Sequence, residues 1–237
     1  MANDLQRTNE WLLQRKGHIT ASEVEKILVG SKKKDEVFGQ TALSYLDGKV
    51  AELYMPDNAY LEYLDMFGVE NKAMRWGSAW EDTAREQYCL TMGYEIEDSP
   101  FIPLAGYEKL AGGSPDGLNR DEAAIVEFKC PANPAIHFRH FLYEKPDDLL
   151  SDNRQYYCQC QFNMIAAEAI LGEKVRFCDF VSYDPRVSKS KQLKVLRLPA
   201  DGEMQATLRE RVRLAVEYMR SQIEKIDAMA AVINEYK

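Results

Sequence analysis

Two adjacent segments hold the residues whose types and spacing are suited to chemistry. Asp116 lies between Pro115 and Gly117, which favour a turn. The run 125–130, Ile-Val-Glu-Phe-Lys-Cys, has the composition of a β-strand. Side chains alternate across a strand, so Glu127 and Lys129 share one face, while Val126 and Phe128 pack on the other. A carboxylate and an ammonium group are therefore predicted side by side, with a second carboxylate on a nearby turn.

These groups suit the hydrolysis of a phosphodiester. Mg²⁺ binds hard oxygen ligands, often one or two carboxylates together with waters and a substrate phosphate. Asp116 and Glu127 would supply the carboxylates, and the backbone carbonyl of Phe128 a further oxygen. Lys129 would orient a water or stabilise transition-state charge. The arrangement Pro115-Asp116…Glu127-x-Lys129 follows the pattern PD-(D/E)xK. Taken alone the pattern is weak, and a surface hairpin with a Glu–Lys pair explains it equally well.

Two helical segments offer further polar groups. Glu81 shares a helix face with Ala84 and Tyr88, and a carboxylate on an inward face needs a partner such as a metal site. An ion pair with Arg85 is the simpler alternative. Gln159 and Gln161 lie among aromatic residues, where they are either half-exposed or positioned to hold a water or a DNA phosphate.

Helical periodicity and turn residues predict the elements that position these groups. The predicted helices are 9–13, a helix capped by Thr20 or Ser22 that ends near Val29, 41–54, 76–92, 151–171, and a long amphipathic helix from about Glu203 to the end. The predicted strands are 94–96, 101–104, 109–113, 124–130, 174–183 and 192–198. This order favours an α/β or α+β domain over 1–237, with a mixed central sheet flanked by helices.

Composition limits the other possibilities. The chain has 237 residues, no apolar run long enough for a membrane span and no apolar signal segment at its start, so we expect a cytoplasmic protein. Its five cysteines are not arranged as zinc pairs and are expected to be free thiols. The net charge of −8 argues against a nucleic-acid partner. Local basic clusters at 15–16, 32–34 and 186–194 argue the other way, although each is also explained as a solvated face.

Several segments together resemble the phage lambda exonuclease family, the YqaJ-type viral recombinases of the PD-(D/E)xK nuclease superfamily. The matching segments occur in the family's order: RKGHITASEV (15–24), WGSAWEDTAR (76–85), GSPDGL (113–118), VEFKCP (126–131), YYCQCQF (156–162) and SYDPR (182–186). The segment 30–72 and the helix after about 201 match it loosely or not at all. The resemblance implies a restriction-endonuclease-like core.

The resemblance also implies roles for individual residues. Asp116 and Glu127 correspond to metal ligands and Lys129 to the catalytic lysine. Glu81 corresponds to a carboxylate that completes the site directly or through metal-bound waters, and Gln159 to a glutamine beside it. Arg15 and Ser22 fall where the family binds the 5′-phosphate of a DNA end. The implied cofactor is Mg²⁺, with Mn²⁺ as a substitute.

The activity implied by the resemblance is processive 5′→3′ digestion of one strand of duplex DNA. The implied assembly is a homo-oligomeric ring, with three subunits expected, working with a single-strand annealing protein in phage recombination in a bacterial host. Two alternatives stay open: a structure-specific endonuclease of the junction-resolvase kind, and a DNA-binding scaffold without activity. His137 and His140 are expected to be surface or DNA-contact residues rather than metal ligands.

Overall fold

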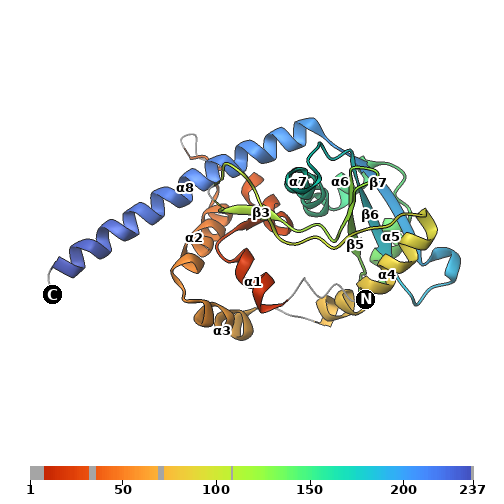
Figure 1. Ribbon diagram of the computed structural model, residues 1–237, viewed down its shortest axis with the longest axis horizontal. Helices are drawn as coiled ribbons and strands as arrows, with labels where there is room; N and C mark the ends of the chain where they lie inside the picture. The colour runs from red at the N-terminus through yellow and green to blue at the C-terminus, as the bar shows by residue number, and fades with distance from the viewer. Residues whose placement is uncertain (1–7, 32–35, 69–71, 108, 236–237) are drawn as a thin grey trace.

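A four-stranded sheet forms the part of the fold that carries the predicted site (Figure 1). The computed structural model describes residues 8–31, 36–68, 72–107 and 109–235. The sheet has the order β4-β5-β6-β7, from strands β4 (Gly117–Asn119), β5 (Ala124–Lys129), β6 (Phe177–Tyr183) and β7 (Leu193–Pro199). β5 and β6 are parallel, and the other pairs are antiparallel. A parallel pair needs a long crossover, which the helices between β5 and β6 provide.

Each face of this sheet packs against a different helix. On one face, Val126 and Phe128 of β5 join Ala84 and Tyr88 of α4 (Lys72–Met92) in an apolar cluster. On the opposite face, Ile125 packs in the larger core with α7 (Arg154–Leu171). Glu127 lies on the α7 side because strand side chains alternate. The predicted separation of Glu127 and Lys129 from Val126 and Phe128 is therefore confirmed.

A second, three-stranded sheet lies on the other side of α7 (Figure 1). Its order is β1-β3-β2, from β1 (Ile19–Thr20), β3 (Ala111–Gly113) and β2 (Ile102–Pro103). β3 passes so close to α7 that a Cβ on Gly113 would lie 2.6 Å from Asn163 Oδ1. The predicted mixed α+β architecture is thus confirmed, with its strands divided between two sheets.

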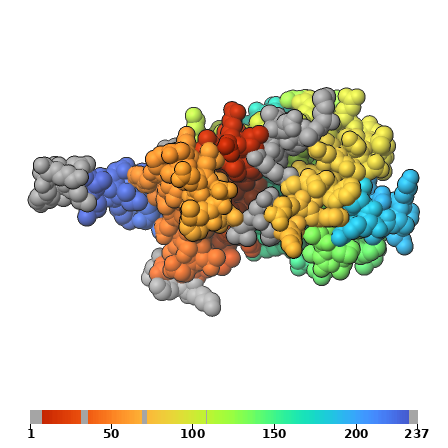
Figure 2. Space-filling model, turned by 90° about the horizontal axis from the view of Figure 1, so that it is seen from below, coloured from red at the N-terminus to blue at the C-terminus, as the bar shows by residue number. Residues whose placement is uncertain are grey.

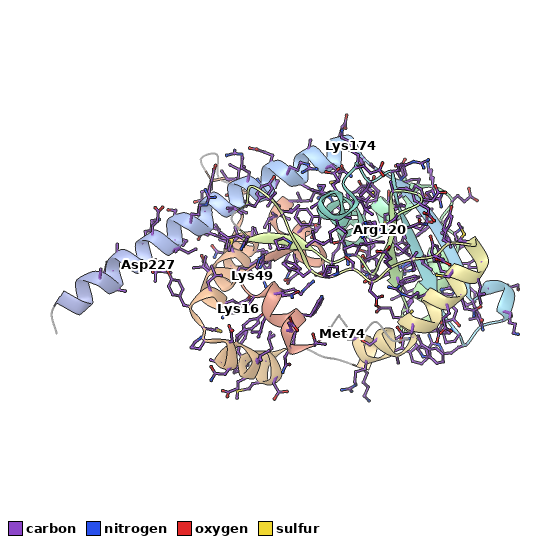
Figure 3. All side chains as sticks on the ribbon, viewed as in Figure 1. Lys16, Lys49, Met74, Arg120, Lys174 and Asp227 are labelled. Atoms are coloured by element: carbon purple, nitrogen blue, oxygen red, sulfur yellow. The ribbon has the colours of Figure 1, made fainter. Side chains whose placement is uncertain are left out.

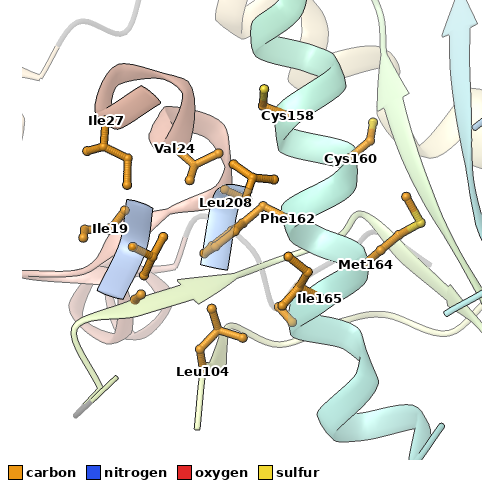
Figure 4. Close-up of a cluster of buried hydrophobic side chains, with 14 of the residues drawn as sticks. Ile19, Val24, Ile27, Leu104, Cys158, Cys160, Phe162, Met164, Ile165 and Leu208 are labelled. Carbon is orange, nitrogen blue, oxygen red and sulfur yellow. The ribbon is translucent and has the colours of Figure 1, made fainter. Parts of the chain in front are cut away.

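The remaining helices complete the fold around these layers. They are α1 (Asn9–Arg15), the 3₁₀ helix η1 (Ala21–Leu28), α2 (Gln40–Tyr54), α3 (Asp57–Phe67), α5 (Pro134–Phe141), α6 (Pro146–Asp152), the short η2 (Lys189–Lys191) and α8 (Gly202–Glu235). Side chains from η1, α7 and α8 meet in the main core, where Val24, Phe162 and Leu208 are fully buried (Figure 4). The C-terminal part of α8 extends beyond the body of the molecule (Figure 1).

Several predicted elements need correction. Residues 21–28 form a 3₁₀ helix, and Thr20 at its N-cap position makes no side-chain capping bond. Residues 94–96 are not a strand, since only Glu97 forms an isolated bridge, to Leu118. The helix predicted over 151–171 is interrupted at Asn153, whose side chain accepts a hydrogen bond from Tyr156 N and caps α7.

Other features of the chain bear on the composition arguments. No helix in the described ranges is both long and apolar enough to cross a membrane. All five cysteines are free thiols, and Cys158 and Cys160 are buried, as expected. The basic cluster predicted at 32–34 lies outside the described residues.

Candidate active site

The turn after β3 brings Asp116 against β5. Asp116 N donates to Val126 O at 3.1 Å, and Phe128 N donates to Asp116 Oδ2 at 2.7 Å. The backbone of β5 therefore fixes the Asp116 carboxylate. The N–H and C=O groups of one strand residue point to the same side, so the Phe128 carbonyl also faces the Asp116 side of β5.

Glu127 is buried, with 1% of its surface exposed, and is surrounded by donors. Lys129 Nζ lies 2.6 Å from its Oε1, and Asn163 Nδ2 lies 2.9 Å from its Oε2. Gln159 Nε2 also donates to Oε1. A buried carboxylate is costly unless it is paired and hydrogen-bonded, and these three side chains meet that requirement.

Lys129 faces two carboxylates and an aromatic ring. Burial alone would lower the pKa of Lys129, but the negative charges of Glu127 and Asp116 outweigh it and raise that pKa above its ordinary value. Its Nζ also lies 4.9 Å from the ring centre of Tyr156 on α7. Lys129 is thus held as a cation, which suits charge stabilisation and the orientation of a water.

An open pocket of about 540 Å³ adjoins this cluster. Glu81 of α4 and Lys129 both line it, and α4 and α5 also contribute Gly77 and Ile136. Glu81 is half-buried, while Ala84 and Tyr88 on the same helix face are buried. Arg85 forms an ion pair with Asp98 at 3.0 Å and donates to the backbone carbonyl of Asp116. Arg85 therefore braces the Asp116 turn.

The donor set at this cluster fits Mg²⁺ better than zinc. Across the described residues, no three His, Cys, Asp or Glu side chains are grouped as a metal cage. Mg²⁺ does not need such a cage, because it commonly keeps several waters and binds one or two carboxylates. Asp116 and Glu127, with the Phe128 carbonyl, are the residues that would hold it, and Glu81 lies at the same pocket.

Arg15 and Ser22, the residues that the resemblance assigned to the 5′-phosphate, contact each other near the Glu127 cluster. Arg15 Nη2 lies 3.5 Å from Ser22 Oγ, and its guanidinium stacks 4.2 Å from the ring centre of Trp11. Burial lowers the pKa of Arg15, while Glu23 and Glu127 act in the opposite direction. Gln155, one helical turn before Gln159, donates to Ser22 O at 2.9 Å. α7 thus connects this pair to the Glu127 cluster.

The expectation for the histidines was wrong, because both are buried. His137 is 0% and His140 2% exposed. Their Nδ1 atoms lie 2.9 and 3.0 Å from Ser182 Oγ. Burial lowers the pKa of His140 to about 4. The two rings anchor α5 to β6 through Ser182, which explains their burial.

Gln161 is also buried and is not half-exposed, but it points away from the site. Its Nε2 donates to Pro199 O at 3.0 Å and its Oε1 accepts from Asp201 N at 2.9 Å.

Two residues of the site, Asn163 and Tyr156, were not predicted from the sequence. The spacing of four between Gln159 and Asn163 was the available signal, since such residues share a helix face.

Comparison with known proteins adds independent information. The model of the YqaJ-like viral recombinase domain matches residues 10–169. The search of curated proteins found no match. Among solved structures, the chain is similar to an alkaline exonuclease, LHK-Exo, from Laribacter hongkongensis, with 25% identity, a TM-score of 0.70, and coverage of 95% of this chain and 100% of the other.

Two further structures show the same fold. LHK-Exo in complex with dAMP gives 24% identity and a TM-score of 0.71, again over 95% of this chain and 100% of the other. A phage-related exonuclease from Haemophilus somnus 129PT gives 16% identity and a TM-score of 0.64, over 88% of this chain and 96% of that one.

Proposed function

Because the chain belongs to the YqaJ-like viral recombinase domain family, we propose that it is a Mg²⁺-dependent exonuclease acting on linear double-stranded DNA. It would digest one strand in the 5′→3′ direction and leave a 3′-ended single strand. The observation that carries this proposal is the Glu127 cluster: a buried carboxylate 2.6 Å from Lys129 Nζ, beside the Asp116 turn and an open pocket.

The residues have distinct tasks in this proposal. Asp116, Glu127 and the Phe128 carbonyl would hold Mg²⁺, or Mn²⁺ in its place, and the bound metal would supply Lewis-acid activation of the scissile phosphate. Lys129 would orient the attacking water and stabilise developing negative charge. Glu81 would act on the metal directly or through its waters. Gln159 holds Glu127 in place, so it would keep that carboxylate oriented for the metal.

Membership of this family supports a wider proposal about the partners and the assembly of the protein. We propose one nuclease domain over 1–237, working with a single-strand annealing protein in phage-type recombination inside a bacterial host cell. We also propose a homo-oligomeric ring, with three subunits expected. A chain of net charge −8 must confine its cations to DNA-facing surfaces, and a ring would gather such surfaces around one channel.

The direct test is digestion of linear, nicked and closed circular duplexes with and without Mg²⁺. The proposal expects loss of linear DNA only with the metal and no cutting of the closed circle. Asp116→Ala should abolish digestion, whereas Asp121→Ala, on an exposed turn, should not change it. Cutting of the closed circle would favour the structure-specific endonuclease, and DNA binding without any digestion would favour the inactive scaffold.

A further inference from the structure

A basic segment projects beside the pocket on an otherwise acidic chain. Five basic residues and no acidic residue occur between Asp184 and Asp201, although the net charge of the chain is −8. Two of the five are engaged: Arg186 pairs with Asp184 and Arg197 with Asp179. The other three are Lys189, Lys191 and Lys194. Within the described ranges these three lysines form no ion pair, so their charges remain available to a partner.

α5 lies against this segment and exposes apolar side chains next to it. Phe138 of α5 is 40% and Leu142, the C-cap residue of that helix, 77% exposed, and their spacing of four places them on one side of it. His137 Nε2 lies 2.7 Å from Lys191 O, which joins α5 to the segment directly beside Phe138. Lys194 Nζ lies 6.0 Å from the ring centre of Phe141. Lysines and exposed apolar groups therefore occupy one continuous surface.

Hydrogen bonds within the segment fix its conformation. Gln192 Nε2 donates to Pro185 O at 2.9 Å and to Val187 O at 3.0 Å, closing the connection between β6 and β7. α5 also forms one wall of the pocket through Asn133, Ile136 and His140. In Figure 2, α5, the 185–192 segment and the start of α4 lie next to one another on one face. Ile136 and His140 line the pocket, whereas Phe138 and Leu142 lie two residues further along and so on the other side of α5. The basic segment and α5 therefore connect this surface to the rim of the pocket.

We propose that this surface, formed by Phe138, Leu142, Lys189, Lys191 and Lys194, binds single-stranded DNA beside the active site. Lysines match the phosphate backbone, and an exposed aromatic ring can stack on an unpaired base. A duplex hides its bases, so Phe138 and Leu142 would gain little from one. The inference deepens the proposed function, on which it rests, by naming a place for the unpaired strand at the digestion fork.

The test measures binding without cleavage. A fluorescent (dT)20 oligonucleotide and a 20-bp duplex are titrated with the full chain in EDTA, by anisotropy, over a range of salt concentrations. Phe138→Ala should weaken (dT)20 binding about fivefold or more, the lower end of the effect of losing one stacked base. Replacing the three lysines by Gln should reduce the magnitude of the slope of log K against log salt by about 2, because each phosphate contact on a single strand contributes roughly 0.7 to that slope.

Matched controls lie elsewhere on the molecule. Leu90→Ala removes an apolar side chain that is 79% exposed, against 40% for Phe138. Lys174→Gln removes an exposed lysine at the edge of the molecule opposite Met74 of the pocket (Figure 3). Neither should change (dT)20 binding. Unchanged binding in the Phe138 and lysine variants would overturn the proposal. Equal weakening for single strand and duplex would assign the surface to duplex DNA.

A change of mass by light scattering in Phe138→Ala would instead assign the surface to a subunit contact and overturn the proposal. The result of this binding test is independent of the result of the digestion test for the proposed function. If the wild-type chain binds (dT)20 through these residues yet digests no DNA with Mg²⁺, the nuclease proposal fails and the single-strand surface stands.

Discussion

Asn163 Nδ2 lies 2.9 Å from Glu127 Oε2, and both side chains are buried. The same amide also accepts a hydrogen bond from Ser114 N at 3.1 Å through its Oδ1. Ser114 directly follows β3, whereas Glu127 is in β5 of the other sheet. One side chain of α7 therefore fixes a candidate metal ligand and the start of the Asp116 turn at the same time.

Asn163→Ala should lower both stability and activity. The substitution leaves the Ser114 N–H and one oxygen of Glu127 without this partner, and an unsatisfied buried polar group costs about 1–3 kcal/mol. Urea unfolding should show a loss of roughly 2 kcal/mol, and DNA digestion should slow. Asn58→Ala, on the exposed surface of α3, is the matched control and should have little effect on either. Full stability in Asn163→Ala would contradict the assigned hydrogen bonds.

Arg186→Ala should destabilise the chain more than a comparable surface change. Arg186 forms a bidentate pair with Asp184, which is 0% exposed, and donates to the carbonyls of Pro131 and Ala132 at the pocket wall. Breaking a fully buried pair costs about 3–5 kcal/mol, and the partial exposure of Arg186 reduces this to roughly 2 kcal/mol.

Arg139→Ala is the control for that measurement. It breaks an ion pair with Asp152 in which the Arg139 side chain is 59% exposed, and exposed pairs contribute at most about 1 kcal/mol. Thermal or urea unfolding of the two variants side by side gives the comparison. Equal losses of unfolding free energy in the two variants would show that the burial of Asp184 does not strengthen its ion pair with Arg186.

The sequence predicted the parts of the site that depend on local rules. Strand alternation placed Glu127 and Lys129 together, and Pro115 with Gly117 placed Asp116 in a turn. Both rules act over a few residues and need no knowledge of the fold. Asn163 was missed because its importance comes from β3 and β5 both reaching α7, which only the tertiary fold determines.

The helices α3 and α5 were not predicted. The polar residues Asn58, Glu62 and Asp65 of α3 recur at helical spacing, so the sequence contained a signal for this helix that was not used, although Tyr60 alone of its residues is buried. α5 is short and begins at Pro134 after the N-cap Asn133, and its two histidines are polar residues in buried positions. Hydrophobic periodicity therefore gave no signal for it. The residues 94–96 have strand-like composition but pair with no neighbouring strand.

Stability should fall between pH 6.5 and 4 in a way that depends on His140. Burial lowers its pKa from 6.5 to about 4, so the unfolded chain takes up a proton first as the pH falls. The stabilising effect of the neutral ring is complete above pH 6.5 and is lost as the pH falls through the folded value. Over this window the loss approaches roughly 3 kcal/mol.

The measurement is urea unfolding at several pH values for the wild type and His140→Gln. The variant should be less stable at pH 7.5 because it loses the Ser182 contact, and its stability should change less between pH 6.5 and 4. Phe138→Leu, on the exposed side of α5, should keep the wild-type pH dependence. An unchanged slope in His140→Gln would show that other groups produce the acid sensitivity.

Arg15→Gln should remove a preference for 5′-phosphorylated ends. Arg15 is held by stacking on Trp11 and by Ser22 Oγ, and a planar guanidinium binds phosphate oxygens in a bidentate manner. Digestion of 5′-phosphorylated DNA should slow at least tenfold, equivalent to about 1.4 kcal/mol of lost transition-state stabilisation, while 5′-hydroxyl DNA changes little. Initial rates on the two substrates give the ratio directly. Arg176→Gln, which removes a side chain 65% exposed, is the control and should leave both rates unchanged. Equal slowing of both substrates by Arg15→Gln would mean that Arg15 supports the fold near Glu127 and does not read the end, since loss of a structural cation affects every substrate alike.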